Sequence, residues 1–251
     1  ASLQRLNILF KLLERNRKRI EPLAKELGAT KQEVHRNLVR LEGSGLITKE
    51  KDGKYSLTTF GKTMCVEIPS ILFLSQHNEY FQDHDFGSIP LKFVMRAGQL
   101  ATGSHIKGIT KTLQKWKSVY SNANEYICEI LSEIPEDLFD PILKKIKNGV
   151  KFEYIVSESA IVPEGRLARL KKSGFYELLE NGSIERKMQK SVQTVVILNE
   201  KEACVFFPKN GEADLTEMFY SDQDVFHEWC LDYFRYCWYN SGSFQENKLK
   251  E

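Results

Sequence analysis

Two helix signals separated by only two residues, near the N-terminal end of the chain, constrain its fold more than any other feature. Glu21-Pro22 favours the start of a short helix, since proline is tolerated in a first turn, and the glycine of Gly28-Ala29 favours its end. Thr30 and Glu33 then form a capping box, so the next helix is predicted to begin near Lys31. Gly28-Ala29 is therefore the whole connection, and this is the spacing of a helix-turn-helix.

The helix that begins near Lys31 is expected to have one apolar and one basic face. Its apolar residues at i, i+4 and i+7 form one buried stripe: Val34, Leu38 and Leu41. The opposite side of the helix carries three long polar or basic residues: Gln32, Arg36 and Arg40. His35 and Val39 flank these three residues. The exposed face of this helix is therefore polar and basic.

A basic hairpin is predicted directly after this helix. Strands are expected over residues 46–50 and 54–58, because the Asp52-Gly53 dipeptide between them favours a type I′ turn. The tip is rich in lysine: Lys49, Lys51 and Lys54. With an apolar helix over residues 3–13 in front, the order of elements is helix, helix, capped helix and basic hairpin. This is the order of a winged helix-turn-helix.

The charge of the chain is uneven, and this bears on its partner. Residues 1–62 carry 14 Lys and Arg against 7 Asp and Glu, whereas the remaining 189 residues carry 22 against 27. A basic segment of this kind points to nucleic acid or to an anionic membrane. Because the helix face and the hairpin tip share one sign of charge, we expect double-stranded DNA as the partner. The alternative is a protein-contact module, which predicts apolar or acidic exposed positions that the helix lacks.

The predicted DNA contacts divide by position. Gln32 and Arg36 lie at the centre of the exposed helix face, where glutamine can bind adenine and arginine can bind guanine with two hydrogen bonds each. The peripheral and hairpin lysines are expected to meet phosphates: Lys31, Lys49, Lys51 and Lys54. His35 and Arg40 complete the predicted DNA-binding residues.

The rest of the chain predicts an α/β sheet domain, so the predicted fold class is α+β. A helix capped by Thr58 or Thr59 is expected to be interrupted at Pro69, and the apolar stretch Ile68–Phe73 is expected to hold a homodimer together. Helices are predicted over 123–132, 136–147 and 225–240, and strands over 150–156, 183–189, 192–199 and 203–208. The expected domains are 1–66 for DNA binding, 67–104 for connection and dimerisation, and 105–244 for sensing, with a disordered tail over 245–251. Ala101–Ser104 is the expected internal linker.

Two resemblances to known families refine this interpretation. Leu23–Thr30, Arg40–Glu42 and Gly45–Ile47 resemble prokaryotic winged-helix transcription regulators of the ArsR/MarR kind. Three segments further along resemble archaeal regulators of the methanogenesis-regulator type: Phe81–Pro90, Lys147–Phe152 and Trp229–Trp238. In these regulators a winged helix precedes a domain with a phospholipase-D-like fold. The resemblance implies a homodimeric transcription factor with a ligand- or signal-responsive domain.

Some residues of the chain could instead form a catalytic site or a metal site. Phosphodiesterases of the phospholipase D family need H-x-K-x-x-x-x-D, in which histidine attacks phosphorus. His105-Ile106-Lys107 supplies the first half, but the acid position is Thr112, so we expect no enzyme; the alternative is a phosphodiesterase or nuclease. Two sets of side chains could bind a metal but are expected to be structural: His77 and His84 with Asp83 and Asp85, and His227 with Cys230 and Cys237.

Composition bears on the remaining classes. No apolar run approaches the ~18 residues of a membrane span, and the first residues lack the layout of a signal peptide. Five cysteines without a C-x-x-C pair argue against a disulfide framework or a zinc ribbon and suit a reducing compartment. We therefore expect a cytoplasmic protein that uses no cofactor and no membrane. Its expected partners are DNA, a second copy of itself and an unknown small-molecule effector.

Overall fold

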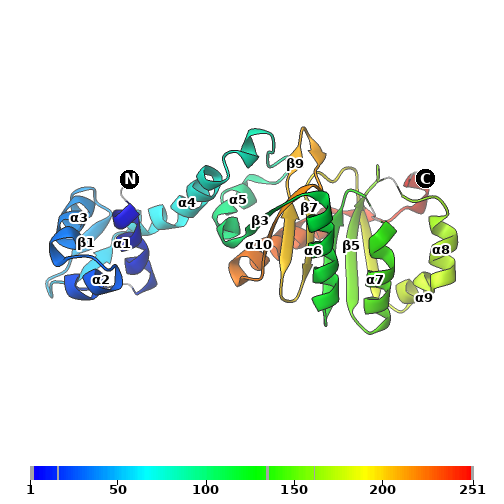
Figure 1. The fold of residues 1–251 in the computed structure, drawn as a ribbon, viewed down its shortest axis with the longest axis horizontal. Helices are drawn as coiled ribbons and strands as arrows, with labels where there is room; N and C mark the ends of the chain where they lie inside the picture. Colours follow the sequence, from blue (N-terminus) through cyan, green and yellow to red (C-terminus); the bar gives the residue numbers. More distant parts are fainter. Residues whose placement is uncertain (1–2, 16, 134–135, 161, 250–251) are drawn as a thin grey trace. The chain divides into compact units, whose positions relative to one another are not determined.

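A computed structural model describes residues 3–15, 17–133, 136–160 and 162–249 of the chain (Figure 1). The chain divides into two compact units, the first ending at Leu72 and the second beginning at Phe73. The predicted DNA-binding segment ends earlier, at residue 66. The fold class is α+β, as the sequence predicts.

The first unit contains the expected helices and hairpin in the expected order. Its elements are α1 (Leu3–Glu14), α2 (Ile20–Glu26), α3 (Lys31–Gly43), β1 (Ile47–Lys49), β2 (Tyr55–Leu57) and the first part of α4 (Thr59–Gln76). β1 and β2 pair antiparallel, with Ile47 opposite Leu57 and Lys49 opposite Tyr55. Fully buried residues of the three helices form the centre of the core: Ile8, Leu12, Leu23, Val34 and Leu38.

The local signals that predicted α3 and the hairpin are present in the structure. The Thr30 hydroxyl oxygen accepts a hydrogen bond from the Glu33 backbone N–H at 3.2 Å, and the Thr30 backbone N–H donates to the Glu33 carboxylate at 3.0 Å. Both halves of the capping box are therefore formed. Gly53 has φ +79°, the left-handed conformation that the turn between β1 and β2 requires.

The predicted interruption at Pro69 is wrong, because α4 continues as one helix to Gln76. Proline removes one intrahelical hydrogen bond and disfavours helical geometry in the residue before it. Cys65 and Phe73, on either side of Pro69, are 2% and 0% exposed. Their burial in two separate cores outweighs the local preference at Pro69.

The second unit is built on one eight-stranded mixed sheet of order β12-β6-β5-β4-β7-β8-β11-β3. Its strands are β3 (Ser104–Lys107), β4 (Tyr126–Leu131), β5 (Lys151–Ser157), β6 (Ile184–Gln189), β7 (Val195–Asn199), β8 (Ala203–Phe206), β11 (Glu217–Ser221) and β12 (Gly242–Ser243). The three strands β4, β5 and β6 are parallel to one another, and all other pairs are antiparallel. β9 (Pro208–Lys209) and β10 (Glu212–Ala213) form a separate small hairpin.

Helices cover both faces of this sheet (Figure 1). One face carries α6 (Ile109–Asn122), α7 (Glu136–Lys147), α8 (Arg166–Ser173) and α9 (Phe175–Glu180), and α10 (Asp224–Asn240) packs on the other. Shorter helical segments precede the sheet or follow α10: η1 (Tyr80–Gln82), α5 (Leu91–Val94), η2 (Ala97–Thr102) and η3 (Glu246–Lys248). Strands β7 and β8 are buried along their whole length, as expected of the centre of a covered sheet.

Most elements predicted for this unit are confirmed, but residues 123–132 are not a helix. The prediction for 136–147 coincides with α7, and those for 150–156, 183–189, 192–199, 203–208 and 225–240 overlap β5, β6, β7, β8 and α10. Residues 126–131 form strand β4, which pairs parallel with β5 and antiparallel with β7. A short apolar run has no periodicity that separates a buried strand from a buried helix, and here the pairing partners decide.

The expected linker and the expected disordered tail are also corrected. Residues 101 and 102 end η2 and Ser104 begins β3, with Gly103 between them. A Cβ added at Gly103 would lie 2.6 Å from the Phe226 ring, so this segment packs against α10. In the tail, the Glu246 carboxylate pairs with the guanidinium groups of Arg166 and Arg186, the latter at 3.1 Å. Residues 246–248 are therefore ordered as η3, while residues 250–251 lie outside the described part.

All five cysteines are buried as free thiols: Cys65, Cys128, Cys204, Cys230 and Cys237. Burial raises the pKa of each thiol above its ordinary value. They act as small apolar residues of the two cores. Within the described ranges, no helix is long and apolar enough to cross a membrane.

Candidate nucleic-acid interface

The exposed face of α3 carries the residues that the sequence singles out for it. Val34, Leu38 and Leu41 are 4% exposed or less, which fixes the buried side of the helix. Asn37, which the sequence analysis did not place, joins this side, and its amide donates to the Glu33 carbonyl at 3.0 Å. The remaining side is exposed along its length: Lys31, Gln32, His35, Arg36, Val39 and Arg40.

Three of these residues lie at the centre of the exposed face. At about 100° per residue, Gln32, Arg36 and Val39 fall within about 60° of one another and point away from the buried stripe. Val39 is 52% exposed and lies between Arg36 and Arg40 along α3. Apolar groups in this position can contact the methyl group of thymine. Val39 therefore joins Gln32 and Arg36 as a candidate base contact that the predicted set omitted.

The ion pairs separate the predicted cations into two groups. Lys31 pairs with the carboxylate of Glu21, and Lys54 pairs with Asp52 at 2.7 Å. Within the described residues, no ion pair forms at Arg36, Arg40 or Lys51. The Lys49 ammonium nitrogen lies 5.8 Å from the centre of the Tyr55 ring, and the Lys49 backbone N–H donates to the Glu42 carboxylate at 3.2 Å. The cations without an ion pair thus lie on the C-terminal two-thirds of α3 and on the hairpin. The acid that interacts with Arg36 is the exposed Glu33, whose pKa is lowered by its hydrogen bonds with Thr30 and by the charge of Arg36.

A segment between α1 and α2 adds basic residues beside the hairpin. Lys18 forms an antiparallel bridge with Tyr55, its N–H donating to the Tyr55 carbonyl at 3.1 Å and its carbonyl accepting at 2.8 Å. The Lys18 side chain is buried and pairs with Glu26. Its neighbours Arg17 and Arg19 remain exposed, and Arg17 lies 3.5 Å from Glu50. The basic run was visible in the sequence, but its pairing with β2 joins residues too distant for local patterns to predict.

The H-x-K segment in the second unit lies on edge strand β3 without the geometry of the phosphodiesterase motif. His105 Nε2 lies 2.8 Å from a Glu217 carboxylate oxygen, and its ring stacks on Phe219 with centroids 4.8 Å apart. Burial lowers the pKa of His105, and Glu217 opposes this shift. Thr112, at the position of the required acid, is 1% exposed and donates its hydroxyl to the Leu215 carbonyl at 2.9 Å. It supplies no carboxylate to the histidine.

The histidines near residues 77–85 form separate contacts. His84 lies between two carboxylates, with Nδ1 2.7 Å from Asp83 and Nε2 3.0 Å from Asp214. His77 instead packs against the rings of Phe73 and His105. Across the described ranges, no group of three or more His, Cys, Asp and Glu side chains is arranged to hold a metal ion.

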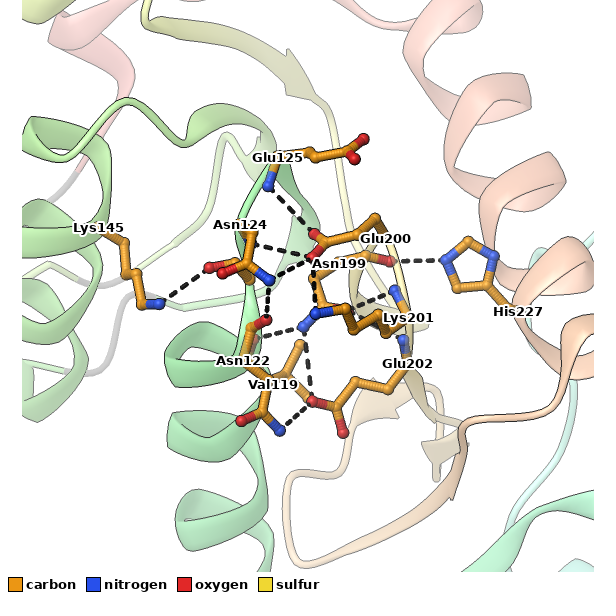
Figure 2. Close-up of polar contacts among 11 residues, drawn as sticks. Val119, Asn122, Asn124, Glu125, Lys145, Asn199, Glu200, Lys201, Glu202 and His227 are labelled. Atoms are coloured by element: carbon orange, nitrogen blue, oxygen red, sulfur yellow. Dashed lines mark hydrogen bonds and ion pairs between the residues drawn. The ribbon is translucent and has the colours of Figure 1, made fainter.

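His227 takes part in a polar network at the turn between β7 and β8, which Figure 2 shows. Its Nε2 lies 2.6 Å from the Asn199 carbonyl oxygen, and the Asn199 side chain donates to the Val119 carbonyl at 2.7 Å. Asn122, at the end of α6, donates to Glu202 at 2.6 Å. The network ties α6 and α10 to the same turn, so the contacts of His227 are those of a structural residue.

Comparisons with known proteins were made over the whole chain. The family model HVO_A0114 matches residues 2–60. No curated protein matches the chain. Among solved structures, the chain is similar to TrmBL2, described as an archaeal chromatin protein with a novel mode of DNA binding, at 15% identity and a TM-score of 0.44, covering 97% of this chain and 95% of that one.

Two further similar structures each cover part of the chain. They are NucT from Helicobacter pylori, at 14% identity and a TM-score of 0.43, and Nuc from Salmonella typhimurium, a phospholipase D family member, at 15% and 0.43. Each covers 57% of this chain and nearly all of the other, 98% and 99%.

Proposed function

We propose that the chain is a homodimeric, sequence-specific DNA-binding transcription regulator whose second unit responds to a ligand. One observation carries this proposal: the exposed face of α3 presents Arg36 and Arg40 without ion-pair partners among the described residues, around the exposed Gln32 and Val39. A protein-contact helix would bury apolar residues or compensate its charges. A helix that enters the major groove leaves its cations free for DNA.

The division of contacts follows from where each group lies. Gln32 and Arg36 at the centre of the face of α3 would bind base edges, and His35 and Arg40 would flank them. Lys49 and Lys51 on the hairpin would neutralise phosphates. Lys31 and Lys54 already have carboxylate partners, so each would have to exchange an ion pair for a phosphate. We therefore assign Lys31 and Lys54 smaller contributions to DNA binding than Lys49 and Lys51.

The test compares two charge-removing substitutions on two duplexes. A preferred sequence is first selected from a pool of random duplexes. Arg36→Ala should then weaken binding to that sequence by about 1–3 kcal/mol and leave a scrambled duplex nearly unaffected. Lys51→Ala should weaken binding to both duplexes equally. It should also reduce the slope of log K against log salt concentration by about 1, because one phosphate contact is lost.

Lys172→Ala in α8 is the matched control, because this exposed lysine lies in the second unit. It should change neither affinity nor salt dependence. Equal losses on both duplexes with Arg36→Ala would refute the assignment of α3 to base recognition. If neither Arg36→Ala nor Lys51→Ala weakens binding, DNA binding by this unit is refuted.

We propose α4 as the dimer contact. Four of its apolar residues recur at i, i+4, i+8 and i+11 and so share one side of the helix: Phe60, Met64, Ile68 and Ile71. Phe60 and Ile71 are 55% and 62% exposed. Phe73, which the sequence analysis included in the contact, is instead fully buried in the core of the second unit. A second copy that contributes the same stripe would cover both and present two α3 helices to a palindromic site.

Light scattering at tens of micromolar tests the dimer. Ile71→Glu should yield a monomer. Val66→Glu is the control, since Val66 is 66% exposed but lies at least about 120° from every member of the stripe around the helix axis. A monomeric wild-type protein, or an Ile71→Glu variant that remains dimeric, would refute this contact.

We also propose that the second unit has no phosphodiesterase activity. The support is the buried hydroxyl of Thr112 at the position where the family requires an acid. The purified protein should not hydrolyse bis-p-nitrophenyl phosphate. Turnover that disappears in His105→Ala would overturn this proposal.

A further inference from the structure

The second unit contains a cavity between its sheet and the helices α6 to α9. Its volume is about 60 Å³, and its walls are almost entirely aromatic and aliphatic. Aromatic rings from both layers surround it: Trp116 and Tyr120 from α6, Phe152 and Tyr154 from β5, and Phe139 and Phe175 from the helices above. The single carboxylate on its wall belongs to Glu129, in the middle of β4.

The Glu129 carboxylate is buried and has few polar neighbours. The side chain is 1% exposed, and its Oε1 accepts a hydrogen bond from Trp116 Nε1 at 2.9 Å. Its Oε2 is buried and pairs with no basic side chain of the described residues. The Tyr120 hydroxyl lies beside the carboxylate and, with Trp116, opposes the effect of burial on its pKa. Arg166 lines the same cavity, but its guanidinium is held by Glu246.

Burying this carboxylate without a cationic partner costs free energy, and a bound cation in the cavity would reduce that cost. An unpaired buried carboxylate oxygen loses its hydration without compensation, which costs more than a typical hydrogen bond contributes. Burial accordingly raises the pKa of Glu129 to about 7. The Glu129 carboxylate therefore has no cationic partner among the described residues, and the aromatic rings of the cavity wall are groups that can attract a cation.

We propose that this cavity binds a small apolar amine, whose ammonium group donates to the Glu129 carboxylate and whose apolar part packs between the rings of α6 and β5. The proposal rests on the proposed function in one respect, since it makes this amine the signal to which the second unit responds. Binding itself needs only the cavity and Glu129.

Size restricts the amine. A cavity of about 150 Å³ accommodates benzene, so one of 60 Å³ accepts a chain of two or three carbons without rearrangement. A smaller adjoining hollow of about 40 Å³ shares Phe139, Arg166 and Leu170 with it. Phe139 is half-buried, and its displacement would join the two spaces. Larger amines such as benzylamine then fit only if Phe139 moves.

Calorimetric titration of the full chain tests the proposal. The probes are n-propylamine and benzylamine, each against the alcohol of the same shape, between pH 6 and 8. The amines should bind at least tenfold more tightly than the alcohols, and their affinity should rise with pH because ionised Glu129 is the form that pairs. Glu129→Gln should lose both the preference and the pH dependence. Glu125→Gln, the same change at an exposed position beside β4, should lose neither.

A measurement on the wild-type protein guards against a variant that fails to fold. Carbon NMR of the glutamate carboxyls should show the Glu129 pKa fall when propylamine is added. Equal binding of amine and alcohol, unchanged amine binding by Glu129→Gln, or a Glu129 pKa that does not move would each overturn the site. If the proposed DNA-binding function were refuted, these outcomes would still test the amine site, because none of the measurements involves DNA.

Discussion

Glu129 makes the stability of the second unit depend on pH in a way that one substitution removes. Its pKa rises from 4.5 to about 7 in the folded protein, with burial as the largest cause. A carboxyl with a raised pKa favours folding in its neutral form. Its contribution is therefore complete below about pH 4.5 and is lost as the pH rises through 7, after which it stays constant. A shift of this size corresponds to about 3 kcal/mol, most of it lost between pH 5 and 7.

The measurement is urea unfolding at a series of pH values. Trp116, Trp229 and Trp238 are the three tryptophans of the chain and all lie in the second unit, so their fluorescence reports on that unit alone. The free energy of unfolding of the wild type, relative to Glu129→Gln, should fall by about 2–3 kcal/mol between pH 5 and 8. Glu125→Gln should follow the wild type. Parallel wild-type and Glu129→Gln curves would show that Glu129 titrates normally and that the argument from burial is wrong.

Three further substitutions test the packing described above. Thr30→Ala removes the N-cap of α3 and should destabilise the first unit by about 1 kcal/mol, measured by circular dichroism during thermal unfolding. Gly61→Ala should cost that unit about 2 kcal/mol or more, because the added Cβ would lie 1.9 Å from the Leu46 carbonyl oxygen; a stable variant would contradict this packing. Glu246→Ala should destabilise the second unit by about 2 kcal/mol, since it leaves the buried Arg166 unpaired, whereas a truly disordered tail would show no effect.

The sequence predicted most accurately the features that depend on neighbouring residues. The capping box of Thr30 and Glu33 and the Asp52-Gly53 turn require only local hydrogen bonds and backbone preferences, and both occur where they were expected. The limits of α7 agree with prediction because acidic residues begin it and Asn148-Gly149 follows its end. The exposed face of α3 followed from the same helical periodicity.

Features that depend on distant residues could not be predicted in this way. Residues 126–131 form a strand because β5 and β7 pair with them, and Pro69 stays helical because residues on both sides of it are buried in cores. The ion pairs of Lys31 and Lys54, which reduce their expected contribution to DNA binding, depend on side-chain placement. For the cavity a signal did exist: Glu129 is the one charged residue within the apolar run of β4.

The buried cysteines have a practical consequence for experiments on this protein. A thiol reacts with maleimide as its thiolate, and burial both blocks access to these five sulfurs and keeps them protonated at neutral pH. The folded wild-type chain should therefore take up almost no label, while the urea-unfolded chain should take up five. A single cysteine introduced at the exposed position of Lys51 would then carry a fluorophore at one defined place, without removal of any native cysteine.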